Sequence, residues 1–95
     1  MFEDRPKAQV GWMRKEHAED HFAYLAAYRD RILPAGGLRN NPAEWFCGGM
    51  LVMGVGSRAE AAALCEDGPY FKLGLRESYR PCTWGKGPCY GDVTL

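Results

Sequence analysis

The stretch Trp45–Glu66, WFCGGMLVMGVGSRAEAAALCE, contains a strand signal followed closely by the start of a helix. Trp45–Val55 is aromatic, apolar and β-branched, which predicts a buried strand, and its Gly48–Gly49 pair indicates a bulge or a close backbone approach. Ser57 and Glu60 then match a capping box, in which a hydroxyl and a carboxylate bind free amides at a helix start. The sequence therefore predicts a strand up to Val55 and then a helix through about Glu66.

A longer amphipathic segment precedes this stretch. Apolar residues recur there at helical spacing and predict one helix over Met13–Ile32, which ends at Leu33–Gly37, where a proline and two glycines follow. The other predicted elements are a strand end at Phe2–Glu3, a flexible segment up to Gly11, a short strand at Gly37–Asn40, a helical turn at Tyr70–Leu73 and a last strand at Glu77–Trp84.

The order strand, helix, strand, strand, helix, strand predicts a ferredoxin-like α+β fold with one antiparallel sheet and two helices on one face. The other face of such a sheet is uncovered, so we expect a homodimer in which two sheets stack and leave a cleft between the copies. Residues 1–84 would form this domain, and residues 85–95 would extend it at the C-terminus.

Composition limits the partners of the protein. Its 95 residues contain 12 Lys and Arg and 12 Asp and Glu without a basic run, so binding to nucleic acid or to an anionic membrane is not expected. A small neutral or weakly anionic ligand fits this charge balance better. The apolar run Met50–Val55 is too short to cross a bilayer, and the N-terminus has no apolar signal region, so we expect a cytoplasmic protein.

The four cysteines do not have the spacing of a zinc site. There is no Cys-x-x-Cys pair, so buried free thiols are expected, with a Cys82–Cys89 disulfide as an alternative if the chain were exported.

His17 and His21 lie on the apolar side of the predicted long helix, together with Tyr24, Leu25 and Tyr28. A histidine at such a position is packed structurally, binds a metal or transfers protons, and the residues alone leave this open for His21. Metal binding is not expected, because the segment lacks the Glu directly after the first His that the metalloprotease motif requires, and no third ligand is evident.

Several short motifs occur in an order that resembles the YCII-related (YciI-like) family. They are His21–Leu25, Ala35–Leu38, Gly48–Val52, Ser57–Ala61, Gly68–Leu75 and Trp84. The Gly-Gly strand and the Gly-Leu-Arg-Glu-Ser stretch are most similar to the chloro-hydroxyhydroquinone dehydrochlorinase branch of that family.

This resemblance implies a dimeric α/β barrel with a catalytic His-Asp pair, in which the histidine would be His21. The family has an Asp where this chain has Gly68, and the first strand is short. Asp67, one residue earlier, and Asp4 are therefore the two candidate partners of His21.

The expected activity is a cofactor-independent proton transfer by His21, as a lyase or isomerase, on a small oxygenated aromatic or cyclic compound. Dehydrohalogenation, decarboxylation and isomerisation each suit one acid–base residue, and neither a metal nor an organic cofactor is expected. A non-catalytic binding or accessory protein and a cofactor-free oxygenase of quinol-type compounds are the alternatives. The candidate substrate-binding residues are Arg39, which could bind a carboxylate or phenolate, and the aromatic residues Tyr24, Tyr28, Tyr70 and Trp84.

Overall fold

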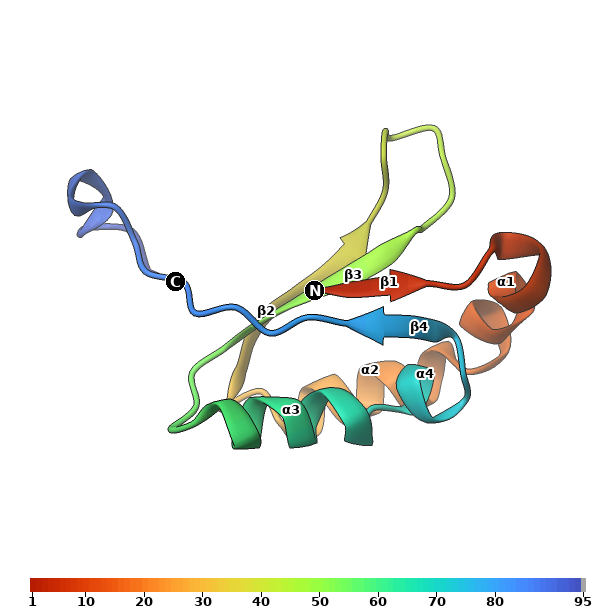
Figure 1. Ribbon diagram of the computed structural model, residues 1–95, viewed down its shortest axis with the longest axis horizontal. Coiled ribbons are helices and arrows are strands. Elements are labelled where there is room, and N and C mark those ends of the chain that lie inside the picture. The colour runs from red at the N-terminus through yellow and green to blue at the C-terminus, as the bar shows by residue number, and fades with distance from the viewer. Residues whose placement is uncertain (95) are drawn as a thin grey trace.

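A four-stranded antiparallel sheet in the order β2-β3-β1-β4 is the centre of the computed structural model, which describes residues 1–94 (Figure 1). The strands are β1 (Phe2–Asp4), β2 (Ile32–Leu38), β3 (Gly48–Met53) and β4 (Arg76–Tyr79). The helices are α1 (Lys7–Glu16), α2 (Ala18–Ala27), α3 (Arg58–Asp67) and α4 (Pro69–Lys72), and a short 3₁₀ turn, η1, spans Pro88–Tyr90. This strand order confirms the predicted ferredoxin-like α+β fold.

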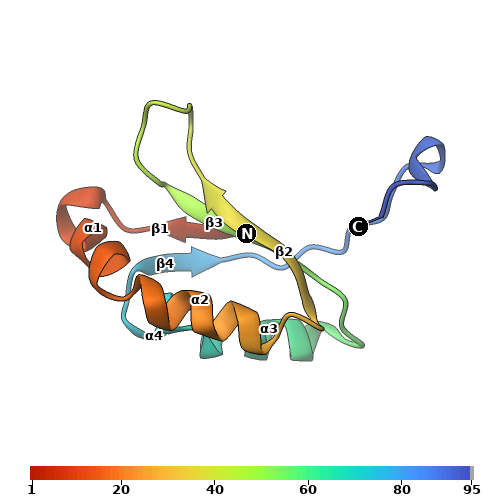
Figure 2. The ribbon, with the colours of Figure 1, turned by 180° about the vertical axis from the view of Figure 1, so that it is seen from behind.

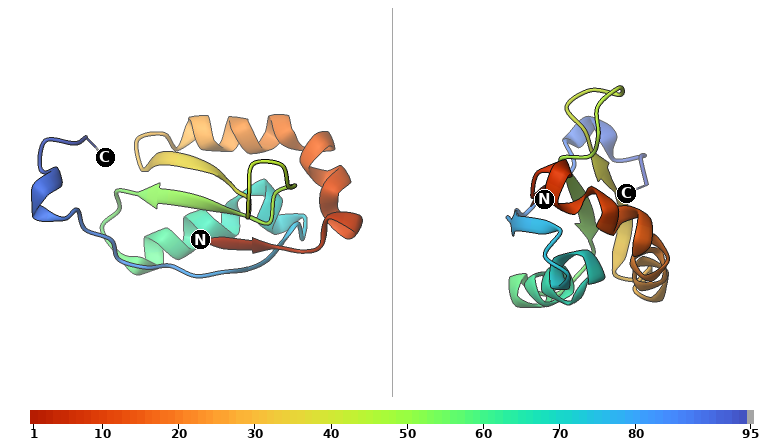
Figure 3. Two further views of the ribbon diagram at one scale, coloured as in Figure 1. Left: turned by 90° about the horizontal axis from the view of Figure 1, so that it is seen from above. Right: turned by 90° about the vertical axis from the view of Figure 1, so that its right-hand side faces the viewer.

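The helices α2 and α3 lie side by side on one face of the sheet, with α4 following α3, and α1 lies at one end (Figures 2 and 3). Val10, Tyr70 and Leu75 form a buried apolar cluster, against which Met13 packs. On the other face, no helix of residues 1–94 covers the strands (Figure 3). Met50 alternates with the inward-facing Leu51 on β3 and is 43% exposed. The sheet therefore has one face packed by helices and one open face.

The glycine pair of β3 allows two close approaches, as the sequence predicted. A Cβ atom on Gly48 would collide with the carbonyl oxygen of Phe2 on the neighbouring strand β1. A Cβ atom on Gly49 would lie 2.8 Å from a guanidinium nitrogen of Arg76. Because these glycines have no side chain, β1 can lie close to β3, and the Arg76 guanidinium has room beside Gly49.

The capping box is confirmed, with one change in its hydrogen bonds. The Ser57 hydroxyl accepts a hydrogen bond of 3.1 Å from the Glu60 amide. The helix α3 begins at Arg58, directly after Ser57. The Glu60 carboxylate accepts a bond of 3.1 Å from the Gly56 amide. The reciprocal bond thus reaches one residue further back than the capping box motif describes.

The prediction of one helix over Met13–Ile32 is wrong. The segment contains two helices that meet at His17, and the first begins at Lys7, inside the segment predicted to be flexible. Residues Ile32–Leu38 form an edge strand, although Pro34 and two glycines lie within it. An edge strand tolerates a proline because one side of its backbone needs no ladder hydrogen bond, and the pairing with β3 is irregular between Ile32 and Ala35.

The predicted last strand is also too long. The strand β4 ends at Tyr79, and the chain after it extends away from the sheet (Figure 1). The predicted extension over residues 85–95 can be followed to Thr94, and Leu95 lies outside the described residues. Likewise, β3 spans only Gly48–Met53 of the predicted strand.

All four cysteines are free thiols. Only Cys65 is buried, so the expectation of burial is wrong for Cys47, Cys82 and Cys89, which lie in loops and in the tail. No helix within residues 1–94 has the length and apolar character that a membrane span requires.

Candidate active site

A cavity of about 260 Å³ lies between α2 and the helix-covered face of the sheet. Its walls combine cationic side chains, aromatic rings and small residues of β2. The lining residues are Arg14, Lys15, Ala18, His21, Phe22, Leu25, Ala35, Gly36, Gly37, Trp45, Phe46, Leu51, Tyr70 and Arg76. A volume of this size is close to the lower limit of ordinary small-molecule sites, and it suits a ligand of about one ring.

His21 lines this cavity and stacks on Tyr70. The centroids of the two rings are 4.0 Å apart, and their planes differ by 10°. Burial, and then the positive charges of Arg76 and Arg14, lower the pKa of His21 from its ordinary value of 6.5 to about 4. The imidazole is therefore neutral near pH 7, with a nitrogen free to accept a proton.

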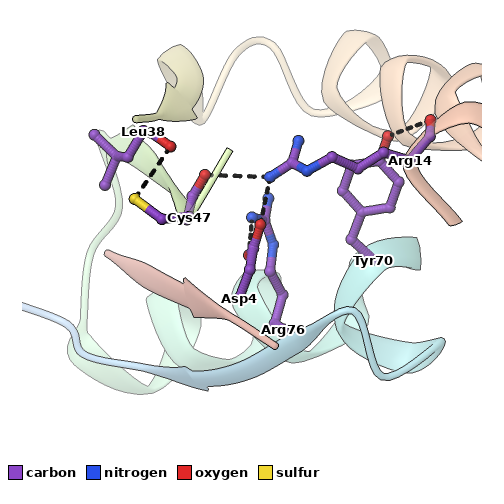
Figure 4. A network of polar contacts seen from close by, with 7 residues as sticks. Asp4, Arg14, Leu38, Cys47, Tyr70 and Arg76 are labelled. Atoms are coloured by element: carbon purple, nitrogen blue, oxygen red, sulfur yellow. Dashed lines mark hydrogen bonds and ion pairs between the residues drawn. The ribbon is translucent and has the colours of Figure 1, made fainter. Parts of the chain in front are cut away.

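Asp4 lies at the centre of a buried ion network (Figure 4). Its Oδ2 accepts a hydrogen bond of 2.6 Å from Arg14, and its Oδ1 accepts one of 2.7 Å from Arg76. Only 2% of the Asp4 side chain is exposed, compared with 12% for Arg14 and 5% for Arg76. Such a buried network is stable only when the charges and polar atoms find partners, and here each carboxylate oxygen binds one guanidinium group.

Backbone pairing and helix contacts position this network. Asp4 and Arg76 are cross-strand partners on β1 and β4. Arg14 comes from α1. Its guanidinium also donates a hydrogen bond of 3.2 Å to the carbonyl oxygen of Gly48 on β3. The Tyr70 hydroxyl, on α4, donates a bond of 3.2 Å to the Arg14 carbonyl oxygen (Figure 4). Residues of three strands and two helices therefore meet at this network.

The loop between β2 and β3 supplies two further aromatic walls. The Arg14 guanidinium lies 4.3 Å from the centre of the Phe46 ring, a distance typical of a cation–π contact. Trp45 meets Phe46 edge to face, with 5.6 Å between ring centres. Phe46 occupies space beside Gly37, where a Cβ atom would collide with its ring. The glycine in β2 thus lets this loop reach the cavity.

Of the residues proposed from the sequence, the structure brings His21, Tyr70 and, through its two arginines, Asp4 to one cavity. Asp67 instead lines a more open groove of about 500 Å³ with Tyr28 and Arg31. Its carboxylate lies 3.0 Å from the Lys72 ammonium group. Among residues 1–94, no hydrogen bond or ion pair joins His21 to Asp4 or to Asp67.

The other three candidates lie outside the cavity lining. The Tyr24 hydroxyl donates a 2.6 Å hydrogen bond to the Leu64 carbonyl oxygen, and burial raises the pKa of Tyr24 to about 12. Arg39 is exposed and donates to the Pro42 carbonyl oxygen at 3.3 Å. Trp84 lies in the tail and is 60% exposed.

His17, at the junction of α1 and α2, lies 3.9 Å from the Asp20 carboxylate and packs edge-on against Trp12. Among residues 1–94, no three His, Cys, Asp or Glu side chains lie close enough together to hold a metal ion.

Sequence reasoning missed Arg14, Arg76, Trp45 and Phe46 as site residues. Arginines are common on protein surfaces, and nothing in the spacing of Arg14 and Arg76 indicates that they share one carboxylate. Gly49 is the one local signal, because a glycine inside a strand indicates that another group approaches closely, and here that group is Arg76.

A model of the YCII-related domain matches residues 1–84 of the chain. The chain belongs to the YCII-related family. A solved structure with the same fold is the 5-chloro-2-hydroxyhydroquinone dehydrochlorinase from Burkholderia phenoliruptrix AC1100, determined in complex with 2,5-dihydroxybenzoquinone. This YCII-related chain is 24% identical to that protein, with a TM-score of 0.78 and 90% of each chain covered. Among curated proteins, none matches the chain.

Proposed function

We propose that the protein is a cofactor-independent lyase or isomerase that uses His21 to transfer a proton on a small oxygenated ring compound. The observation that carries this proposal is a neutral imidazole, stacked on Tyr70, in the wall of a cavity of about 260 Å³. A neutral histidine can accept a proton, and a positioned base contributes roughly 10²- to 10⁴-fold to a rate. The pKa of about 4 makes His21 a weaker base in the free protein than an ordinary histidine.

The proposed reaction needs no reactant other than the ring compound, His21 and water. His21 takes a proton from a C–H or O–H group of the ring, and the electron pair of that bond forms a new double bond. In an elimination, the leaving group departs with its own electron pair as an anion such as chloride, and the imidazolium then releases its proton to water. In an isomerisation, the imidazolium returns the proton to another atom of the ring. One base at one cavity therefore serves both reaction classes.

The shape and chemistry of the cavity favour a flat ring. Trp45 and Phe46 supply aromatic surfaces beside the stacked His21 and Tyr70 rings, and aromatic faces bind planar ligands by stacking. The dehydrochlorinase of the same fold acts, by its name, on a chlorinated hydroxyhydroquinone and holds a dihydroxybenzoquinone. Both compounds are single oxygenated rings, and this supports the same substrate class for this chain.

The open face of the sheet supports a homodimer as the working unit. Met50 and Val52 project from β3 on the side opposite Leu51, which lines the cavity. Stacking two such faces would bury them from water, and interfaces of stable dimers commonly exceed about 1,600 Å².

The experiment is hydrogen exchange into the ring carbons of 2,5-dihydroxybenzoquinone in D₂O, together with chloride release from 5-chloro-2-hydroxyhydroquinone. The wild type should accelerate at least one of the two above the rate in buffer. His21→Gln should lower that acceleration by roughly 10²- to 10⁴-fold while the protein stays folded. An acceleration that survives His21→Gln would contradict the role of His21.

A non-catalytic binding protein is the second candidate, and one observation favours it. Among residues 1–94, no carboxylate contacts His21 to fix its tautomer and stabilise its cation, a role that acid partners serve in many histidine enzymes. In that case 2,5-dihydroxybenzoquinone would bind in the cavity, and neither exchange nor chloride release would exceed the buffer rate.

A further inference from the structure

The cavity carries an excess of positive charge. Within residues 1–94, its lining contains Arg14, Arg76 and Lys15 but no Asp or Glu. Asp4 lies just behind the lining and binds both arginines, so two guanidinium charges share one carboxylate. One positive charge of this buried trio therefore stays uncompensated by the protein, in a place where screening by water is weak.

The guanidinium groups also retain donors. Arg14 uses its Nη2 for Asp4 and for the Gly48 carbonyl oxygen, and Arg76 uses its Nη1 for Asp4. A guanidinium has five N–H donors, so several are left on each side chain. Among residues 1–94, no side-chain nitrogen is both buried and unbonded, so the remaining donors of these arginines still reach solvent.

We propose that Arg14 and Arg76 form an oxyanion-binding site in this cavity, and that Asp4 is the positioning residue that holds the two guanidinium groups in place. The proposal rests on the proposed function and deepens it by naming the substrate class. The ligand is a ring compound with an acidic phenol or enol group, which binds as its anion. A neutral ring of equal size lacks the charge that the site requires.

Charge balance supports an anion at this position. Transfer of an anion into the cavity costs desolvation, but the uncompensated guanidinium charge is already largely buried and held by Asp4, so the anion gains a strong, preorganised interaction. Phe46 and Tyr70 lie beside the arginines, with the Arg14 guanidinium 4.3 Å and 5.4 Å from their ring centres. The ring of the ligand would therefore pack against Phe46 while its oxygen reaches the guanidinium groups.

Anion binding also acts on His21. The positive charges of Arg76 and Arg14 contribute to the low pKa of His21. An anion bound beside these arginines cancels part of that effect and raises the pKa of His21 toward 6.5. The base thus becomes stronger when the substrate is bound, and the proton that it accepts faces less repulsion.

The test uses 4-nitrophenol, which ionises near neutral pH and becomes yellow as the phenolate. Titrated into the wild type, the probe should bind as the phenolate, and its pKa in the complex should lie below its pKa in buffer. Arg14→Gln should weaken phenolate binding by roughly 10- to 100-fold, because it removes a charged hydrogen-bond donor. Arg29→Gln removes an equal charge from the exposed turn that follows α2 and should leave binding unchanged.

The wild-type spectrum needs no folded variant, so it can overturn the proposal even if Arg14→Gln does not fold. Binding of the neutral phenol, no binding at all, or phenolate binding that Arg14→Gln leaves intact would each overturn the oxyanion site.

His21→Gln separates this inference from the proposed function. His21→Gln is assayed for turnover of 2,5-dihydroxybenzoquinone, and Arg14→Gln is assayed for phenolate binding. If binding depends on Arg14 while turnover does not depend on His21, the oxyanion site stands and the proposed function fails. If turnover depends on His21 while phenolate binding does not depend on Arg14, the oxyanion site fails alone.

Discussion

Asp4 and Arg76 lie opposite each other on the neighbouring strands β1 and β4, and their side chains form a 2.7 Å ion pair on the helix-covered face of the sheet. The pair fits there because Gly49, on the other neighbour of β1, has no side chain. A Cβ atom on Gly49 would lie 2.8 Å from Nη2 and 3.0 Å from Nη1 of Arg76. The absence of a side chain at Gly49 thus leaves space in the sheet for the Arg76 guanidinium group beside the cavity.

Gly49→Ala should therefore displace Arg76 and weaken the network. Placing a methyl group into a packed site costs roughly 1–3 kcal/mol of unfolding free energy. The measurement is urea unfolding of the variant and the wild type. Gly36→Ala is the matched control, because no atom lies within 4 Å of a Cβ atom there. Equal destabilisation by both substitutions would mean that the loss comes from the glycine backbone and not from Arg76.

The parts of the fold that follow from local sequence were predictable. The helix α3 begins where Ser57 and Glu60 indicate, and the strand β3 contains the apolar run around Gly48–Gly49. The order of elements was enough to predict the ferredoxin-like sheet. The edge strand β2 was not predictable, because Pro34 is acceptable there only through its place at the edge of the sheet, and this place is a tertiary property.

The site was only half predictable for a similar reason. His21 and Tyr70 could be selected as single residues with suitable chemistry, and the structure stacks them in one cavity. The ion network depends on residues 4, 14 and 76, which are far apart in the sequence and meet only when β1, α1 and β4 assemble. Local spacing carries no information about such a meeting.

The low pKa of His21 predicts a pH dependence of stability. The folded protein holds the pKa of His21 at about 4, below the ordinary value of 6.5, through burial and the charges of Arg76 and Arg14. Between these two values the unfolded chain binds the proton and the folded protein does not, so stability contributed by the neutral imidazole is lost as pH falls from 6.5 to 4. Lys15 and Tyr70 are the other titratable groups that line the cavity with these residues.

Urea unfolding at several pH values between 4 and 7 checks this expectation. His21→Gln cannot take up the proton, so its loss of stability over the same range should be smaller than that of the wild type. His17→Gln is the control, since His17 lies outside the cavity lining. Parallel curves for the wild type and His21→Gln would show that His21 titrates normally in the folded protein.

The open face of the sheet predicts that a charge at Met50 prevents dimer formation. Met50→Glu places a carboxylate on the face that we propose to be buried between two copies, where an unpaired charge is costly. Sedimentation should show a dimer for the wild type at micromolar concentration and a monomer for Met50→Glu. Leu73→Glu, which changes a residue of similar exposure at the end of α4, should remain dimeric. A monomeric wild type would remove the dimer from the proposed function.

The last prediction separates the two candidate partners of His21. Asp67 lies in a half-exposed pair with Lys72, and such pairs contribute about 0–1 kcal/mol, so Asp67→Asn should change stability and turnover little. Asp4 is 2% exposed and binds two arginines, so Asp4→Asn leaves buried cations short of a partner. Removing one partner of such a group typically costs about 3–5 kcal/mol, and we expect a loss of that order in urea unfolding. The turnover of the same variants is then measured as hydrogen exchange into 2,5-dihydroxybenzoquinone. A large loss of turnover in folded Asp67→Asn would mean that Asp67 acts at the cavity after all.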